Sequence, residues 1–66
     1  MQIVLNGEPR EVAEGATVAD ILDQLALSGQ PVAVEVNLHV VPRPRHAQCV
    51  LCEGDRLEVV TLVGGG

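Results

Sequence analysis

A single amphipathic helix between extended segments limits the folds open to this chain. Thr17 is a candidate N-cap, and Asp20 three residues later completes a pattern close to a capping box. We expect the helix to close at Gly29 as a left-handed cap, because Pro31 forbids its continuation. Its one apolar stripe, at helical spacing, consists of Val18, Ile21, Leu22 and Leu25. A helix with one such stripe predicts a sheet that covers it.

Extended segments lie on both sides of this helix. Asn6-Gly7 is typical of a type I′ hairpin turn, and Pro9 marks the segment after it as an edge strand. Residues 43–48 are expected to be irregular or to form one helical turn. The expected strands, read from alternating apolar residues and turn signals, are residues 2–6, 8–12, 32–36, 38–41 and 56–63.

These elements predict an α+β roll, a mixed sheet of about five strands with one helix packed across one face. The first and last strands have the strongest apolar character on both faces, so we expect them to be central and parallel. Leu57 and Val59 are expected to face the helix. The 66 residues allow one domain, which we place at residues 1–63, followed by a flexible glycine tail at residues 64–66.

Charge and composition narrow the possible functions. Four arginines against nine acidic residues give a net charge of −5, which disfavours nucleic acid and anionic membranes and favours a basic protein partner. The aromatic content of 0% removes the platforms on which nucleic acid bases stack. No apolar run has the length of a membrane span and no leader opens the chain, so we expect a cytoplasmic protein.

The chain ends in Gly64, Gly65 and Gly66, which directly extend the last expected strand. Extended, three residues reach about 10 Å, and without Cβ atoms they fit a channel that other residues would block. We therefore expect the Gly66 carboxylate to be the reactive group, with Gly64 and Gly65 bound by a partner. The alternative is a frayed terminus without a role.

Val60 and Leu62 have the opposite parity from the core-facing residues of the last strand. They should therefore lie on the uncovered face of the sheet, next to the glycine tail. Together with Val4 they are a candidate apolar docking patch for a partner. The alternative is that they are ordinary exposed valine and leucine side chains.

Cys49 and Cys52 form a Cys-x-x-Cys pattern downstream of His39 and His46. Such a set could supply zinc ligands or a redox pair, but its spacing is not that of a zinc finger. We expect two small packing residues and no metal site. A small metal or thiol-redox module remains the alternative from a different functional class.

Several segments in a fixed order carry a resemblance to a known family. They are Met1-Gln2-Ile3, Val36-Asn37, Val41-Pro42-Arg43, the run from Glu53 to Val60, and Val63-Gly64-Gly65-Gly66. In this order and spacing the sequence resembles the ThiS family, ubiquitin-like β-grasp proteins that carry sulfur in bacterial thiamine biosynthesis. The resemblance covers essentially the whole chain.

The resemblance implies a protein cosubstrate rather than an enzyme, with no cofactor bound to this chain. An E1-like (ThiF-like) enzyme would use its own ATP and magnesium to adenylate Gly66. A cysteine desulfurase relay would then supply the sulfur of a thiocarboxylate, which a thiazole synthase (ThiG-like) would accept. The related MoaD proteins keep a second sulfur pathway, molybdopterin synthesis, open as an alternative.

Overall fold

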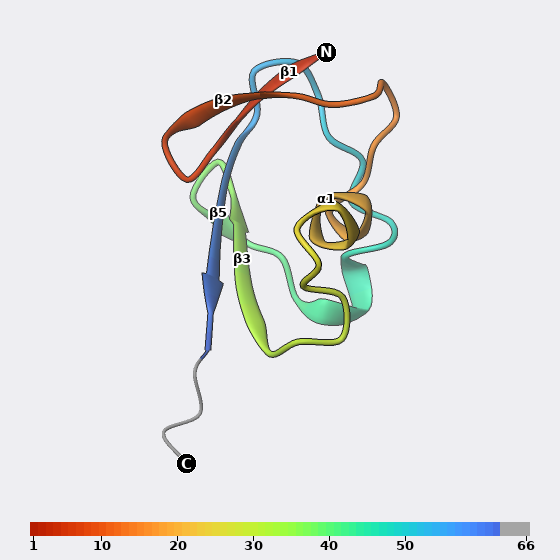
Figure 1. Cartoon of the computed structure of the whole chain (residues 1–66), viewed down its shortest axis with the longest axis vertical. Coiled ribbons are helices and arrows are strands. Elements are labelled where there is room, and N and C mark those ends of the chain that lie inside the picture. The colour runs from red at the N-terminus through yellow and green to blue at the C-terminus, as the bar shows by residue number, and fades with distance from the viewer. Residues whose placement is uncertain (63–66) are drawn as a thin grey trace.

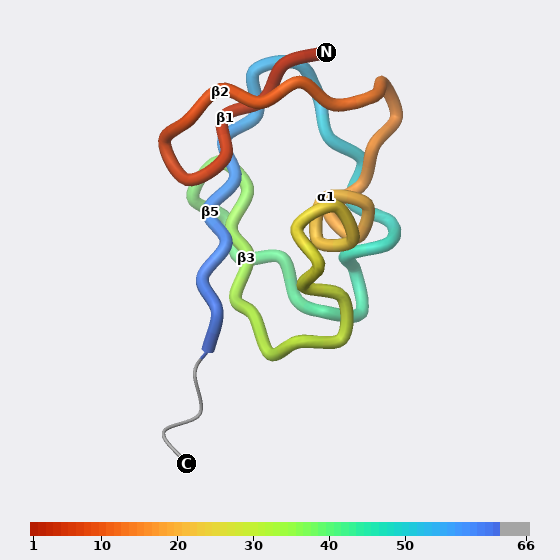
Figure 2. Tube along the Cα trace, in the orientation of Figure 1, coloured from red at the N-terminus to blue at the C-terminus, as the bar shows by residue number. Residues whose placement is uncertain are grey.

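The computed structural model describes residues 1–62 and contains one helix and one sheet in this part of the chain (Figures 1 and 2). The expected order of elements is confirmed. Val63 and the glycine tail lie outside the described residues. In chain order the elements are β1 (Gln2–Leu5), β2 (Glu8–Glu11), α1 (Val18–Gln24), β3 (Val32–Val36), β4 (His39–Val40), the 3₁₀ turn η1 (Arg43–Arg45) and β5 (Arg56–Thr61).

The five strands form one mixed sheet in the order β2-β1-β5-β3-β4. β1 and β5 pair in parallel, and every other neighbouring pair is antiparallel. In Figure 1, β3 and β5 run side by side along the long axis, and α1 covers only one side of them. The predicted α+β roll, with its first and last strands inside the sheet and parallel, is confirmed. β2 is an edge strand, as Pro9 indicated.

The hairpin between β1 and β2 turns at Asn6 and Gly7, as the sequence predicted. Both residues have positive φ, 50° and 84°, which is the conformation of a type I′ turn. Side chains alternate along β1, so that Ile3 and Leu5 are buried on the helix side. The core consists of Ile3, Leu5, Val12, Ala16, Val18, Ile21, Leu22, Val34, Leu51, Leu57 and Val59.

The start of α1 is fixed by the predicted capping box. The Thr17 hydroxyl accepts a hydrogen bond from the Asp20 backbone N–H at 3.2 Å, and the Asp20 carboxylate accepts one from the Thr17 N–H at 2.9 Å. The first backbone N–H groups of a helix have no partner within the helix. Here the Val18 N–H donates to the Cys49 backbone carbonyl and the Ala19 N–H donates to the His46 backbone carbonyl. The segment after η1 therefore passes beside the helix, as Figure 2 shows.

The end of α1 corrects the prediction for Gly29. The helix ends at Gln24, and Ala26, with φ of 58°, is the left-handed residue that caps it. Gly29 also has a positive φ, 78°, but lies beyond the cap. The Leu27 N–H donates to the Leu22 carbonyl at 2.8 Å, and the Ala26 N–H donates to the Asp23 carbonyl at 3.0 Å. This pair of bonds is a Schellman motif. Leu27 packs against the core, so side-chain burial ends the helix before a glycine is reached.

We predict that Ala26→Gly stabilises the protein by about 0.5–1 kcal/mol, because an L-residue pays a steric cost in the left-handed region. Denaturant unfolding measures the change. The control is Ala19→Gly inside α1, which should lower the free energy of unfolding by about 1 kcal/mol. A less stable Ala26→Gly variant would contradict the Schellman ending.

Candidate functional site

Strand β5 separates a buried face from an exposed one. Leu57 is fully buried and Val59 is 8% exposed, whereas Val60 and Leu62 are 56% and 53% exposed. The predicted parity of this strand is therefore confirmed. Val60 and Leu62 lie on the face that α1 does not cover, and only Val63 separates Leu62 from the glycine tail in the sequence. An exposed apolar pair at this place can contact a partner that approaches the tail.

Val4 does not join this pair. It is half-buried on β1, where its register partners are Pro9 on β2 and Arg56 on β5. Arg56 precedes Val60 by four residues, which corresponds to about 13 Å along a strand. The structure therefore brings Val60 and Leu62 together but leaves Val4 at the other end of the uncovered face.

Ala33 and Val40 extend the exposed apolar pair across the sheet, on the side of β5 away from β1. Ala33 is exposed and is the register partner of Val60 on β3. Val40, 73% exposed, lies on β4 opposite Glu35. Both are apolar residues at the exposed parity of their strands, and this alternation was the sequence signal that could have found them. We call Ala33, Val40, Val60 and Leu62 the apolar patch.

Two asparagine side chains hold β5 where strand pairing stops. β1 ends at Leu5, and the Asn6 amide continues the pairing beyond it by donating to the Val59 carbonyl at 3.2 Å and accepting from the Val59 N–H at 2.8 Å. Asn37 accepts from the Arg56 N–H at 3.0 Å and donates to the Asp55 carboxylate. These bonds fix the direction of the strand that leads to the tail. The sequence indicated Asn6 only as a turn residue.

The glycine tail lies outside the described residues. The predicted roles of Gly64, Gly65 and Gly66 therefore stay predictions.

The cysteine and histidine residues have separate surroundings. Cys49 is half-buried and packs against the core, and Cys52 is exposed in a turn; neither is in a disulfide. His46 is buried, and its Nε2 lies 2.9 Å from the Val41 carbonyl oxygen. His39 is exposed on β4. Among residues 1–62, no three histidine, cysteine or acidic side chains come together as a possible metal site.

We predict that replacing both Cys49 and Cys52 by alanine lowers the free energy of unfolding by about 1–3 kcal/mol in total. Most of this loss should come from Cys49, because only its side chain packs against the core. Denaturant unfolding of the two single variants and the double variant measures how much of the loss comes from each cysteine. One zinc ion per chain in the purified wild-type protein would contradict the packing role.

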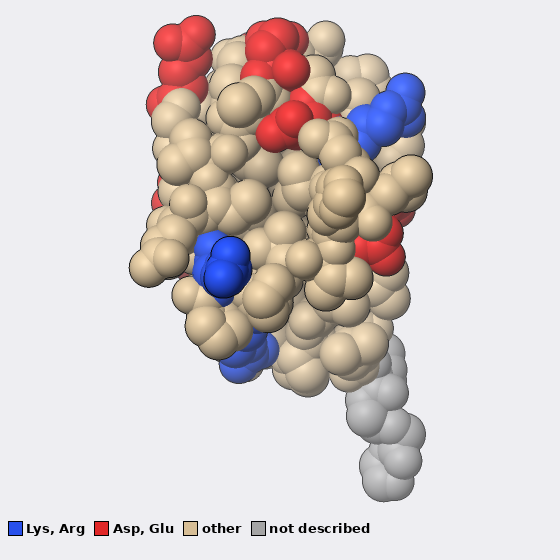
Figure 3. Space-filling model, turned by 180° about the vertical axis from the view of Figure 1, so that it is seen from behind, with Lys and Arg blue, Asp and Glu red and all other residues tan. Residues whose placement is uncertain are grey.

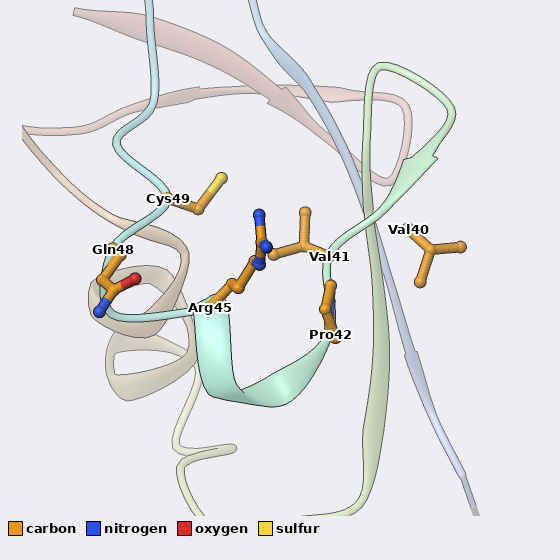
Figure 4. A pocket seen from close by; sticks show the side chains of 6 residues that line it. All are labelled: Val40, Val41, Pro42, Arg45, Gln48 and Cys49. Carbon is orange, nitrogen blue, oxygen red and sulfur yellow. The ribbon is translucent and has the colours of Figure 1, made fainter.

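An open groove of about 530 Å³ runs between β4 and the segment after η1 (Figure 4). The Arg45 side chain extends into it between Cys49 and Val41, as Figure 4 shows. Val40 also lines the groove, so one residue borders both the groove and the uncovered face of the sheet. The groove is lined by Val40, Val41, Pro42, Arg45, Gln48 and Cys49.

The charges are unevenly distributed over the surface. In the back view of Figure 3, most of the visible acidic side chains gather at the end of the molecule opposite the C-terminus, and the arginines are scattered. With a net charge of −5, this surface attracts basic partners. No helix within residues 1–62 has the length and hydrophobicity needed to cross a bilayer.

Comparisons with known proteins point to one family. The model of the ThiS family matches residues 3–66. The sulfur carrier protein ThiS of Escherichia coli is 33% identical over 66 residues, with both chains covered completely. The ThiS protein of Thermus thermophilus is 40% identical over 94% of this chain and 95% of its own. The crystal structure of the thiamine biosynthesis protein ThiS from Geobacter metallireducens superimposes with a TM-score of 0.84 at 32% identity, covering 100% of both chains.

Two larger proteins contain a region similar to this chain. Thiazole synthases of Paramagnetospirillum magneticum and Magnetococcus marinus are 42% and 44% identical to it over 66 residues. That region is 100% of this chain but only 20% of each synthase. The chain therefore spans a fifth of the length of these relatives.

Proposed function

The chain belongs to the ThiS family of sulfur carriers with the ubiquitin-like β-grasp fold, and from this membership we propose that Gly66 carries sulfur for thiazole formation in thiamine biosynthesis. The observation that carries the proposal is the family match, which extends through the terminal glycines to residue 66. The chain acts as a cosubstrate of partner enzymes.

The chemistry starts from a carboxylate that is a poor electrophile. An E1-like enzyme that binds ATP and magnesium activates it: a Gly66 carboxylate oxygen attacks the α-phosphorus of ATP, and pyrophosphate leaves. The terminal sulfur of a persulfide, supplied by a cysteine desulfurase relay, then attacks the acyl carbon and AMP leaves. A thiol reductant cleaves the resulting S–S bond, and a thiocarboxylate remains on Gly66.

The apolar patch supports docking of these partners. Val60 on β5 and Leu62 just after it are exposed and precede Gly66 by six and four residues, so we expect an enzyme that holds Gly66 to contact them as well. The Asn6 and Asn37 hydrogen bonds fix β5 against the rest of the sheet. A rigid strand reduces the freedom that the tail loses on binding, which favours productive placement of the carboxylate.

The two thiazole synthases with a matching region support the choice of pathway. A synthase that contains such a region in its own chain indicates that carrier and acceptor work together. We therefore favour thiazole synthase over the molybdopterin pathway as the sulfur acceptor of this protein.

Pyrophosphate release tests the activation step. The protein, ATP, magnesium and the organism's own E1-like enzyme should release pyrophosphate in proportion to the amount of carrier. The matched control is the same protein with its Gly66 carboxylate converted to an amide, which keeps the length of the tail but removes the attacking oxygen. Equal release with the amide, or none with the carboxylate, would contradict the proposal.

A further inference from the structure

The uncovered face of the sheet carries two glutamates at directly opposite positions on neighbouring strands. Glu35 on β3 and Glu58 on β5 are register partners, and cross-strand partners lie on the same face. Both have the opposite parity from the buried Val34 and Leu57. Within residues 1–62, no hydrogen bond or ion pair reaches either carboxylate, and Arg56 on the same face is not within ion-pair distance of them. Like charges placed directly opposite each other destabilise a sheet, so the fold gains nothing from this pair.

The apolar patch borders this pair on two sides, at β4 and at the row of residues that follows Glu58 along β5. Val40 is opposite Glu35 on β4, and the pair of Ala33 and Val60 lies two residues further along the same face. A partner that covers the apolar patch therefore also covers the carboxylates. Removing water from ionised carboxylates is costly unless a cation with good geometry replaces it. The partner surface that fits here is apolar and contains a basic group.

We propose that Glu35 and Glu58 together bind an arginine side chain of the thiazole synthase when the synthase docks on the apolar patch. The inference rests on the proposed function, and the synthases that contain a matching region supply the choice of partner. A planar guanidinium has several N–H donors and can bind two carboxylates at once, whereas lysine offers a point charge. The contact selects and orients the partner. Glu58 precedes Gly66 by eight residues and Glu35 by 31 in the sequence, and neither has a proposed role in the reaction at Gly66.

Binding of the purified synthase to the purified carrier tests the proposal without any sulfur chemistry. Glu35→Gln with Glu58→Gln should raise the dissociation constant about tenfold at low salt. The difference should shrink at high ionic strength, because salt weakens the wild-type contact. The matched control is Glu8→Gln with Glu14→Gln, which makes the same change in net charge away from the uncovered face and should leave binding within about twofold.

Thermal unfolding supplies a second readout. Either single glutamine variant should raise the unfolding midpoint by about 1–5 °C, since one substitution already removes the repulsion. Binding should weaken further from the single to the double variant. A partner-binding role thus predicts higher stability and weaker binding in the same protein, which a structural role does not.

The arginine is identified by the same assay. Each synthase arginine is replaced by glutamine in turn, and one of these synthase variants should bind the wild-type carrier as weakly as the wild-type synthase binds the double glutamine carrier. Binding of that synthase variant to the double glutamine carrier should be little weaker still. Unchanged binding of the double glutamine carrier, or an equal loss in the Glu8/Glu14 control, would overturn the inference and leave sulfur carriage intact. If the double glutamine carrier binds the E1-like enzyme more weakly but binds the synthase as tightly as wild type, the assignment to the synthase is wrong. If the wild-type carrier does not bind the synthase, the proposed acceptor fails as well.

Discussion

Deleting Gly66 should lower the rate of thiocarboxylate formation about 100-fold or more and leave the fold unchanged. The shortened chain still ends in a glycine carboxylate, on Gly65, so its chemical reactivity is the same. Its reach is shorter by about 3.3 Å, and misplacing a reacting group by even 1 Å can cost about 100-fold. Single-turnover assays with the E1-like enzyme, ATP and a persulfide donor measure the rate.

Gly65→Leu is the companion variant, because it keeps the length of the tail and adds bulk. It should slow the same step by blocking passage through the partner's channel, whereas Gly66 deletion acts by moving the carboxylate. Unfolding curves that coincide with wild type are the control for both variants. A shortened protein that is thiolated as fast as the intact one would show that the tail is not the site.

Val60→Asp and Leu62→Asp should each weaken docking of the E1-like enzyme about 30-fold or more. A charge placed in the apolar patch must lose water without gaining a partner, which is the kind of change that has large effects at the centre of an interface. Both side chains are more than half exposed in the free protein, so the fold should tolerate the change. The KM of the pyrophosphate-release reaction for the carrier measures the loss.

Val50→Asp is the matched control for the docking variants. Val50 is 58% exposed, close to the values of Val60 and Leu62, but it lies in the segment beside the start of α1. It should leave the KM within about twofold of wild type, as for surface substitutions outside an interface. An equal KM for all three variants would show that the apolar patch does not bind this enzyme.

Local chemistry explains what the sequence could predict. The Thr17 and Asp20 capping box, the Asn6-Gly7 turn and the alternation along β5 depend on residues a few positions apart, and all three are confirmed. Alternation also determines which face of a strand a residue occupies. The two faces of the last strand, and so the exposure of Val60 and Leu62, followed from it.

Longer-range packing explains what the sequence could not predict. Ala26 takes the left-handed position because burial of Leu27 ends the helix there, and glycine preference alone favoured a later end at Gly29. Val4 has the expected face but not the expected neighbours, because alternation leaves the stagger between parallel strands open. The Asn6 amide that pairs with Val59 likewise depends on where β1 stops beside β5, 53 residues away in the chain.

The mass of the C-terminal peptide tests the sulfur-carrier function most directly. After incubation with the E1-like enzyme, ATP, magnesium, a persulfide donor and a thiol reductant, the peptide ending in Gly66 should gain the mass difference of one oxygen-to-sulfur exchange. Peptides that contain Cys49 or Cys52 should keep their mass. A gain of sulfur on a cysteine peptide, with the Gly66 peptide unchanged, would contradict the account.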